Sequence, residues 1–245
     1  MKNKKNIFTI ILVIVFGLVF VPRIIDRLVN NDVSRSESRS LKLDNFEKNI
    51  DSLPYLIIND ERKKVPGFKF VNQNGELISN EFYLGKVYIV EFFFTTCTTI
   101  CPIMNTNLVH IQNSFTAFPN FGIASFSINP EYDTVNILSK YAKDNGIENP
   151  NWNLMTGEAD EIYELANDGF NLYTAASSDF IDGFEHSGYF ALVDKEGYIR
   201  CRQDEFGNPK IYYKGSVNFK EKLDLNGEAE EITVLKEDLL KLLNE

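Results

Sequence analysis

Two cysteines and a histidine are the residues of this chain whose types and spacing could support chemistry. Cys97 and Cys101 lie four residues apart in the stretch TTCTTICP, and His186 lies in the glycine-flanked stretch DGFEHSG. Two nearby thiolates allow either reversible disulfide formation or the binding of a soft metal ion. An added imidazole gives a three-coordinate site suited to Cu(I), although zinc with an open fourth position fits the same ligands.

The sequence around the cysteines predicts a strand, a turn and a helix. Val87–Phe94 is apolar, β-branched and aromatic, which is typical of a buried central strand. After a polar turn, Pro102 opens an amphipathic pattern that runs to about Phe118, and proline is favoured in the first turn of a helix. If Cys101 starts this helix, the helix dipole would lower the pKa of its thiol. We therefore expect both cysteines at the carboxyl end of a central strand, where open α/β sheets bind ligands.

Other interpretations of the cysteines and histidines have to be weighed against this one. A structural disulfide between Cys97 and Cys101 is the alternative, but such a bond rarely lies at the ligand-binding edge of a central strand. Strand alternation places Cys201 on one face with Ile199, so we predict a buried thiol and not a reactive one. His110 lies more than two helical turns beyond Cys101, which predicts an ordinary surface or packing histidine.

The order of the remaining elements predicts an α/β fold, thioredoxin-like, with an added N-terminal β-hairpin. Phe68–Asn72 and Glu76–Ile78 would form that hairpin, and Tyr189–Asp194 would pair with Tyr198–Arg202 in another. The region Gln203–Gly227 is predicted to be a loop that could meet a partner, with packing of its aromatic residues on the domain as the default. The other predicted elements are strands over Leu53–Asn59, Phe121–Ile128 and Asn151–Met155, and helices over Thr134–Asn145, Glu158–Asn167 and Leu235–Leu243.

The N-terminal part of the chain predicts a membrane anchor and a tether. Residues 1–6 form a lysine-bearing cytoplasmic tail, and residues 7–25 a single transmembrane helix that stays uncleaved because no small-x-small site follows it. Residues 26–50 form a polar, serine-rich linker. Residues 51–245 then form one domain on the periplasmic or extracytoplasmic side of a bacterial inner membrane. The formal net charge of −10 argues against nucleic acid as a partner.

The motifs resemble those of the Sco/SenC family, the membrane-anchored copper chaperones of cytochrome c oxidase assembly. Phe94–Pro102 followed by Met104 is similar to the CxxxCP signature of that family. The resemblance continues through Ser127–Thr134, Leu154–Gly157 and the histidine turn with Leu192-Val193-Asp194. It covers most of the chain from Phe68 to Arg202.

This resemblance implies a ligand set, a cargo and a client. The family's copper ligands carry over onto Cys97, Cys101 and His186, with Cu(I) as the bound ion and Cu(II) as a second state. The implied role is delivery of copper to the CuA centre of cytochrome c oxidase subunit II or to another copper client, or reduction of the cysteines of that centre. Thr98, Asn129 and Glu185 depart from the common family pattern without removing a ligand. Glu185 is either an acidic group that orients the ligating imidazole or a solvated loop carboxylate.

The leading hypothesis is therefore a metallochaperone and not a turnover enzyme. The alternative is a thiol–disulfide oxidoreductase that uses Cys97 and Cys101 as its dithiol. Thioredoxin-type reductases place a cis-proline opposite the thiols, and this chain has no proline between Pro150 and Pro209. A peroxiredoxin-like peroxidase is a third hypothesis, but it leaves His186 and one of the cysteines unexplained. The fourth hypothesis is non-catalytic: a redox or copper sensor that signals through a partner.

Overall fold

The structure is a computed structural model that describes residues 52–245 except 173, 177–183, 205 and 225–226. Residues Phe46–Glu245 make up one structural unit. The predicted tail, the predicted anchor at 7–25 and the predicted linker at 26–50 lie outside the described residues. Within the described ranges, no helix combines the length and the apolar character that crossing a membrane requires.

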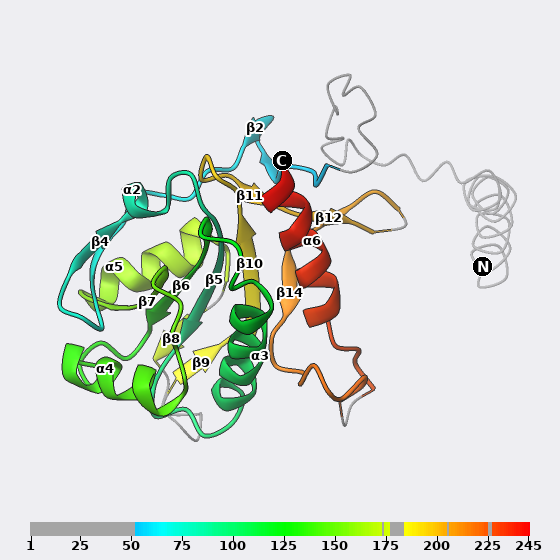
Figure 1. Cartoon of the computed structure of the whole chain (residues 1–245). Coiled ribbons are helices and arrows are strands. Elements are labelled where there is room, and N and C mark those ends of the chain that lie inside the picture. Colours follow the sequence, from blue (N-terminus) through cyan, green and yellow to red (C-terminus); the bar gives the residue numbers. More distant parts are fainter. Residues whose placement is uncertain (1–51, 173, 177–183, 205, 225–226) are drawn as a thin grey trace, which may run out of the picture. The chain divides into compact units, whose positions relative to one another are not determined.

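The domain is built on one mixed sheet with a parallel centre (Figure 1). Strand β5 (Val87–Phe93) pairs in parallel with β6 (Phe121–Ser127), and β6 pairs in parallel with β7 (Trp152–Thr156). Strand β10 (Tyr189–Val193) runs antiparallel to β5 on its other side. The outer strands are β3 (Lys69–Asn72), β4 (Leu77–Ser79), β11 (Ile199–Arg200) and β14 (Tyr212–Lys214). The order is β11-β10-β5-β6-β7-β3-β4, with β14 also paired to β10.

Helices cover both faces of this sheet. Tyr141 of α4 packs against the ring of Phe93, whereas Phe170, which follows α5, packs against the ring of Phe92. Because successive residues of a strand point to opposite faces, α4 and the α5 region lie on opposite sides of the sheet. This arrangement is the predicted thioredoxin-like α/β fold. The helices are α2 (Asn80–Tyr83), α3 (Cys101–Ser114), α4 (Val135–Asp144), α5 (Ala159–Glu164), which continues into a π-helical turn (Leu165–Gly169), and α6 (Ile232–Asn244).

The remaining strands form three short antiparallel ribbons. They are β1 (Ile57–Ile58) with β2 (Glu61–Arg62), β8 (Thr174–Ala176) with β9 (Phe184–His186), and β12 (Arg202–Gln203) with β13 (Pro209–Lys210). In Figure 1 the ribbon that starts at β12 projects from the sheet beside α6.

Several predicted boundaries are wrong. Of the strand predicted over Leu53–Asn59, the structure contains only β1. Asn59 and Asp60 adopt φ values of 54° and 64°, and the chain turns there to begin β2. The helix predicted to run to Phe118 ends at Ser114. The region predicted as a loop supplies β14, because Tyr213 is buried there and donates a hydrogen bond to Asp238 of α6 at 2.8 Å. The predicted N-terminal hairpin is confirmed as β3 and β4.

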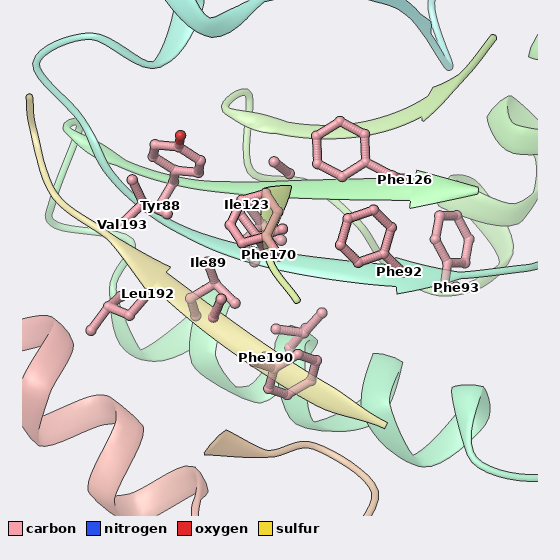
Figure 2. Packing of buried hydrophobic residues seen from close by; sticks show 14 of the residues in the cluster. Tyr88, Ile89, Phe92, Phe93, Ile123, Phe126, Phe170, Phe190, Leu192 and Val193 are labelled. Atoms are coloured by element: carbon pink, nitrogen blue, oxygen red, sulfur yellow. The ribbon is translucent and has the colours of Figure 1, made fainter. Parts of the chain in front are cut away.

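A cluster of aromatic rings fills the face of the sheet that carries Phe92 (Figure 2). Phe126 is fully buried, and its ring centroid lies 5.4 Å from that of Phe92 on the neighbouring strand. The rings of Phe68 and Phe70 meet Phe126 edge-on, at centroid distances of 5.1 and 5.7 Å. Such pairs add favourable quadrupole geometry to the burial of apolar surface. Phe126 therefore joins β3, β5 and β6 into one packed layer.

We predict that Phe126→Ala lowers the free energy of unfolding by about 3–5 kcal/mol, because it removes a fully buried ring and leaves a cavity. Phe206→Ala is the matched control, because Phe206 is 72% exposed at the tip of the β12–β13 ribbon. That control should change the free energy by about 0.5 kcal/mol or less. Urea unfolding followed by circular dichroism measures both variants, and equal effects would contradict this account of the core.

Candidate thiol and metal site

The structure brings the two predicted cysteines into contact at the junction of β5 and α3. Both carry thiols, with Cys97 7% exposed and Cys101 2% exposed. The backbone N–H of Cys101 points at Sγ of Cys97 across 3.4 Å, and a further hydrogen bond joins the two sulfurs. Cys97 is thus the outer thiol of the pair, and Cys101 is the inner one.

The pKa of Cys101 differs from the prediction. Cys101 does begin α3, but its thiol pKa is raised well above its usual range, first by the hydrogen bond with Cys97 and then by burial. A hydrogen bond with the backbone of Phe94 opposes this shift only in part. The predicted lowering by the helix dipole is wrong for Cys101. The N–H at the start of α3 is directed at the sulfur of Cys97 instead.

A buried carboxylate holds the cysteine turn against the end of β6. Asp133 is fully buried and accepts a hydrogen bond from the backbone N–H of Thr95 at 3.0 Å. The hydroxyl of Thr95 donates to the same carboxylate, as does the hydroxyl of Ser127 at 2.5 Å. Asp133 belongs to the stretch Ser127–Thr134 that resembles the family, but the sequence predicted no role for it. Its position six residues after the last residue of β6 was the available signal, because loops at the carboxyl ends of neighbouring parallel strands meet.

His186 lies on a strand that ends beside the cysteine turn. It is the last residue of β9 and not part of a turn as predicted, while Asp182 and Gly183 lie outside the described residues. The structure describes the backbone of His186 and Glu185, and their side chains lie outside the description. Two residues further on, a Cβ placed on Gly188 would lie 3.0 Å from Cδ1 of Ile100 in the cysteine turn. Gly188, two residues after His186, therefore packs against the cysteine turn.

The predicted ligand set is brought together only in part. Among the residues that the structure describes, no group of three or more His, Cys, Asp or Glu side chains could hold a metal ion. Cys97 and Cys101 are two adjacent sulfur donors, and the side chain of the third predicted ligand, His186, lies outside the described part of the chain. The three-residue metal site thus remains a prediction.

The other predicted residues have the packing roles expected of them. The ring of His110 stacks on Phe219 at a centroid distance of 3.8 Å and an angle of 6°, with Nε2 3.2 Å from Nζ of Lys236. Burial and this neighbouring ammonium group lower the pKa of His110. Cys201 is buried as predicted, and burial raises the pKa of its thiol to about 11.

A buried carboxyl group in the central strand was not predicted from the sequence. Glu91 lies within β5, fully surrounded by protein, and accepts a hydrogen bond from the Ser125 hydroxyl at 2.6 Å. Ser125 in turn accepts a hydrogen bond from Nε1 of Trp152 at 2.9 Å. Burial raises the pKa of Glu91 to about 7, and its charge also contributes to the raised pKa of Cys101. The available signal was the single acidic residue inside the apolar run Val87–Phe94.

A mixed sheet with a dithiol between its central strand and the following helix defines a thioredoxin-like thiol protein. More specifically, the chain belongs to the SCO1/SenC family, whose family model matches residues 58–216. The predicted resemblance is thereby confirmed.

Known relatives agree with this assignment. A SCO1 protein homolog of Bacillus subtilis (strain 168) is 33% identical over 138 residues, which span 56% of this chain and 71% of that protein. The structure of BsSco, a Sco family member of cytochrome c oxidase assembly described with a disulfide switch, superposes with a TM-score of 0.58 and 27% identity, over 74% of this chain and 94% of that one. Arabidopsis thaliana ScoI, solved with copper bound, shares the fold with a TM-score of 0.54 and 20% identity, over 74% of this chain and 98% of that one.

We predict that Glu91 makes the domain less stable as the pH rises. Its pKa in the folded chain is about 7 against an ordinary value of 4.5, so the folded state holds the proton more tightly than the unfolded chain does. The stabilising contribution is complete below the ordinary value and is lost as the pH rises through the folded one. The loss amounts to about 3 kcal/mol in the free energy of unfolding.

Glu91→Gln should abolish this part of the pH dependence, because the amide carries no charge and can still accept the hydrogen bond from Ser125. Glu81→Gln, which removes an exposed carboxyl group from α2, is the matched control and should keep the wild-type profile. Urea unfolding at a series of pH values measures the three proteins. A wild-type profile in Glu91→Gln would contradict the assignment.

Proposed function

We propose that this chain is a membrane-anchored, copper-binding assembly protein that holds Cu(I) with Cys97, Cys101 and His186. The observation that carries the proposal is the contact between two thiols at the start of α3, in a member of the SCO1/SenC family. Thiolate sulfur is the ligand type that Cu(I) prefers, and an imidazole completes a three-coordinate site. The copper-bound structure of Arabidopsis thaliana ScoI, which has the same fold, makes copper the metal to test first.

The geometry of the thiol pair supports stepwise transfer of copper to a client. Cys97 is the less deeply buried residue of the pair, so we expect an incoming thiolate to reach the copper from its side. A three-coordinate soft site has room for that additional sulfur, and the copper can then pass over by ligand exchange. Because Cys101 is a buried thiol with a raised pKa, loading of copper must displace its proton. The proposed client is the CuA centre of cytochrome c oxidase subunit II or another copper-binding protein.

Thiol–disulfide exchange is the second candidate function, and the contact between the sulfurs favours it. Oxidation of Cys97 and Cys101 to a disulfide releases two electrons and two protons, which a disulfide of a partner protein would accept as it becomes a dithiol. The same oxidation removes both sulfur ligands from the copper site. BsSco, a relative of 27% identity, is described with a disulfide switch. The redox state of this pair would then decide whether copper can bind.

The proposed location follows from the N-terminal sequence. Residues 7–25 would anchor the chain in the bacterial inner membrane, with the domain on the extracytoplasmic side. The client site of an oxidase and a thiol pair that can be oxidised both suit that compartment.

We expect the reduced protein to bind one Cu(I) tightly in an anaerobic titration against a chromophoric chelator. Cys97→Ser and Cys101→Ser each remove a ligand and should weaken binding by more than about 100-fold. His186→Ala should also weaken binding while leaving the thiols able to form a disulfide. The matched controls are Cys201→Ser and His110→Gln, which alter the buried third thiol and the stacked histidine and should bind as the wild type does.

Two results would contradict the proposal. If the wild-type protein loses the competition with the chelator, the copper site is absent, and the reduction potential of the cysteine pair becomes the measurement that tests thiol exchange. If His186→Ala binds copper as tightly as the wild type, with an unchanged spectrum, the histidine is not a ligand.

A further inference from the structure

A buried hydroxyl group without a partner lies opposite His186. Thr174 is 3% exposed, and its Oγ1 makes no hydrogen bond in the described part of the chain. Leaving a buried hydroxyl group unsatisfied costs about 1–3 kcal/mol, so such a group in a folded protein calls for an explanation.

The position of Thr174 is fixed from the body of the domain. Its backbone N–H donates to Oδ1 of Asn167 at 3.0 Å, and its backbone carbonyl accepts from Nδ2 of the same side chain at 3.2 Å. Asn167 belongs to the π-helical turn after α5. Two residues earlier, the N–H of Leu172 donates to the carbonyl of Ala166 at 2.9 Å. Turns of this type occur frequently at functional sites, and here Asn167 of the turn binds both backbone groups of the first residue of β8.

The ladder between β8 and β9 places this hydroxyl-bearing residue directly across from the predicted ligand. Thr174 pairs with His186, Ala175 with Glu185 and Ala176 with Phe184. Residues directly opposite in an antiparallel ladder share one face, with Cβ atoms about 4.5–5.5 Å apart. Of the three β8 positions, the one across from His186 is the one that carries a polar side chain.

The same register tests whether Glu185 can orient the imidazole, the role that its sequence position suggested. Adjacent residues of a strand belong to opposite faces, so Glu185 and His186 are assigned to different faces of the ribbon. Glu185 pairs with Ala175 on the other face. The register therefore favours Thr174 over Glu185 as the neighbour of the histidine.

We propose that the Thr174 hydroxyl group accepts a hydrogen bond from the imidazole N–H of His186 and so directs the other ring nitrogen toward the cysteine turn. The inference rests on the proposed function, in which His186 is a copper ligand. A metal-binding histidine is neutral, and a partner on its second nitrogen sets the tautomer and the ring orientation. Thr174 is thus a positioning residue that acts through His186.

The test is a double-mutant cycle on the full-length protein in detergent, with anaerobic Cu(I) competition as the measurement. Thr174→Val keeps the shape of the side chain but removes the hydroxyl group, and should weaken copper binding about 10-fold. Thr174→Ser keeps the hydroxyl group and should restore wild-type affinity. In the His186→Ala background, Thr174→Val should cause no further loss, because its effect passes through the imidazole.

Two further measurements make the test independent of copper affinity and of folding. In the copper-free protein, long-range ¹H–¹⁵N spectra should show one imidazole tautomer for His186 in the wild type and a mixture in Thr174→Val. Thr233→Val is the matched control, because Thr233 lies on α6 and its exposed hydroxyl group donates a hydrogen bond to Glu230 at 2.6 Å. If Thr174→Val does not fold, Thr174→Ala takes its place as the variant without the hydroxyl group.

The outcomes separate the inference from the function on which it rests. Wild-type affinity in Thr174→Val, together with weakened binding in His186→Ala, would overturn the role of Thr174 and leave the copper site standing. Equal losses in both backgrounds would also overturn it, because the effect would then be structural. Wild-type binding in His186→Ala would refute the ligand assignment itself, and the inference with it.

Discussion

The parallel pairing of β5 with β6 is the constraint on which the site depends. Seven residue pairs, from Val87–Phe121 to Phe93–Ser127, hold the two strands in register. Both strands therefore end at the same edge of the sheet, where the cysteine turn and the loop that carries Asp133 emerge together. The buried carboxylate of Asp133 then ties Thr95 to Ser127. The ladder sets where the thiols lie, and the carboxylate fixes how their turn is oriented.

Antiparallel partners bring the remaining parts of the site to this edge. Strand β10 runs against β5, so the chain enters β10 where β5 ends. The residues just before β10 consequently approach the cysteine turn, where a Cβ on Gly188 would lie 3.0 Å from Cδ1 of Ile100. Strand β9 precedes this approach and is held by β8, which the side chain of Asn167 fixes to the domain. The thiols thus lie just beyond the end of a central strand, and the histidine lies on a ribbon outside the main sheet.

The polar groups buried near the thiols are costly to the fold. Asp133 offsets its burial with hydrogen bonds from a backbone N–H and two hydroxyl groups. Glu91 accepts a hydrogen bond from Ser125, yet its pKa stays above the ordinary value. The pKa of the Cys101 thiol is raised as well. The protonated form of both groups is therefore favoured in the folded chain. Stability and chemistry are therefore set by the same buried residues.

Much of the central fold could be predicted from the sequence, because the apolar runs of β5 and β6 and the Asn-Gly hairpin of β3 and β4 are local patterns. The cysteine pair, the packing role of His110 and the burial of Cys201 followed from the same kind of evidence. Strand β14 and the β8–β9 ribbon did not, since three-residue strands carry almost no periodicity and exist through their pairing partners. The predicted end of α3 was wrong for a similar reason, because the last turn of a helix depends on what it packs against.

The sequence by itself determined which atoms are available for chemistry: two thiols on a strand–turn–helix unit, one histidine near a turn, and the family to which these motifs belong. Residue types and short spacings decide these features, and no long-range contact is needed to recognise them. Only the tertiary structure decided which thiol is the inner one, that the pKa of Cys101 is raised and not lowered, and that Thr174 lies opposite His186. Burial and strand register are properties of contacts between segments far apart in the chain, and the linear sequence does not contain them.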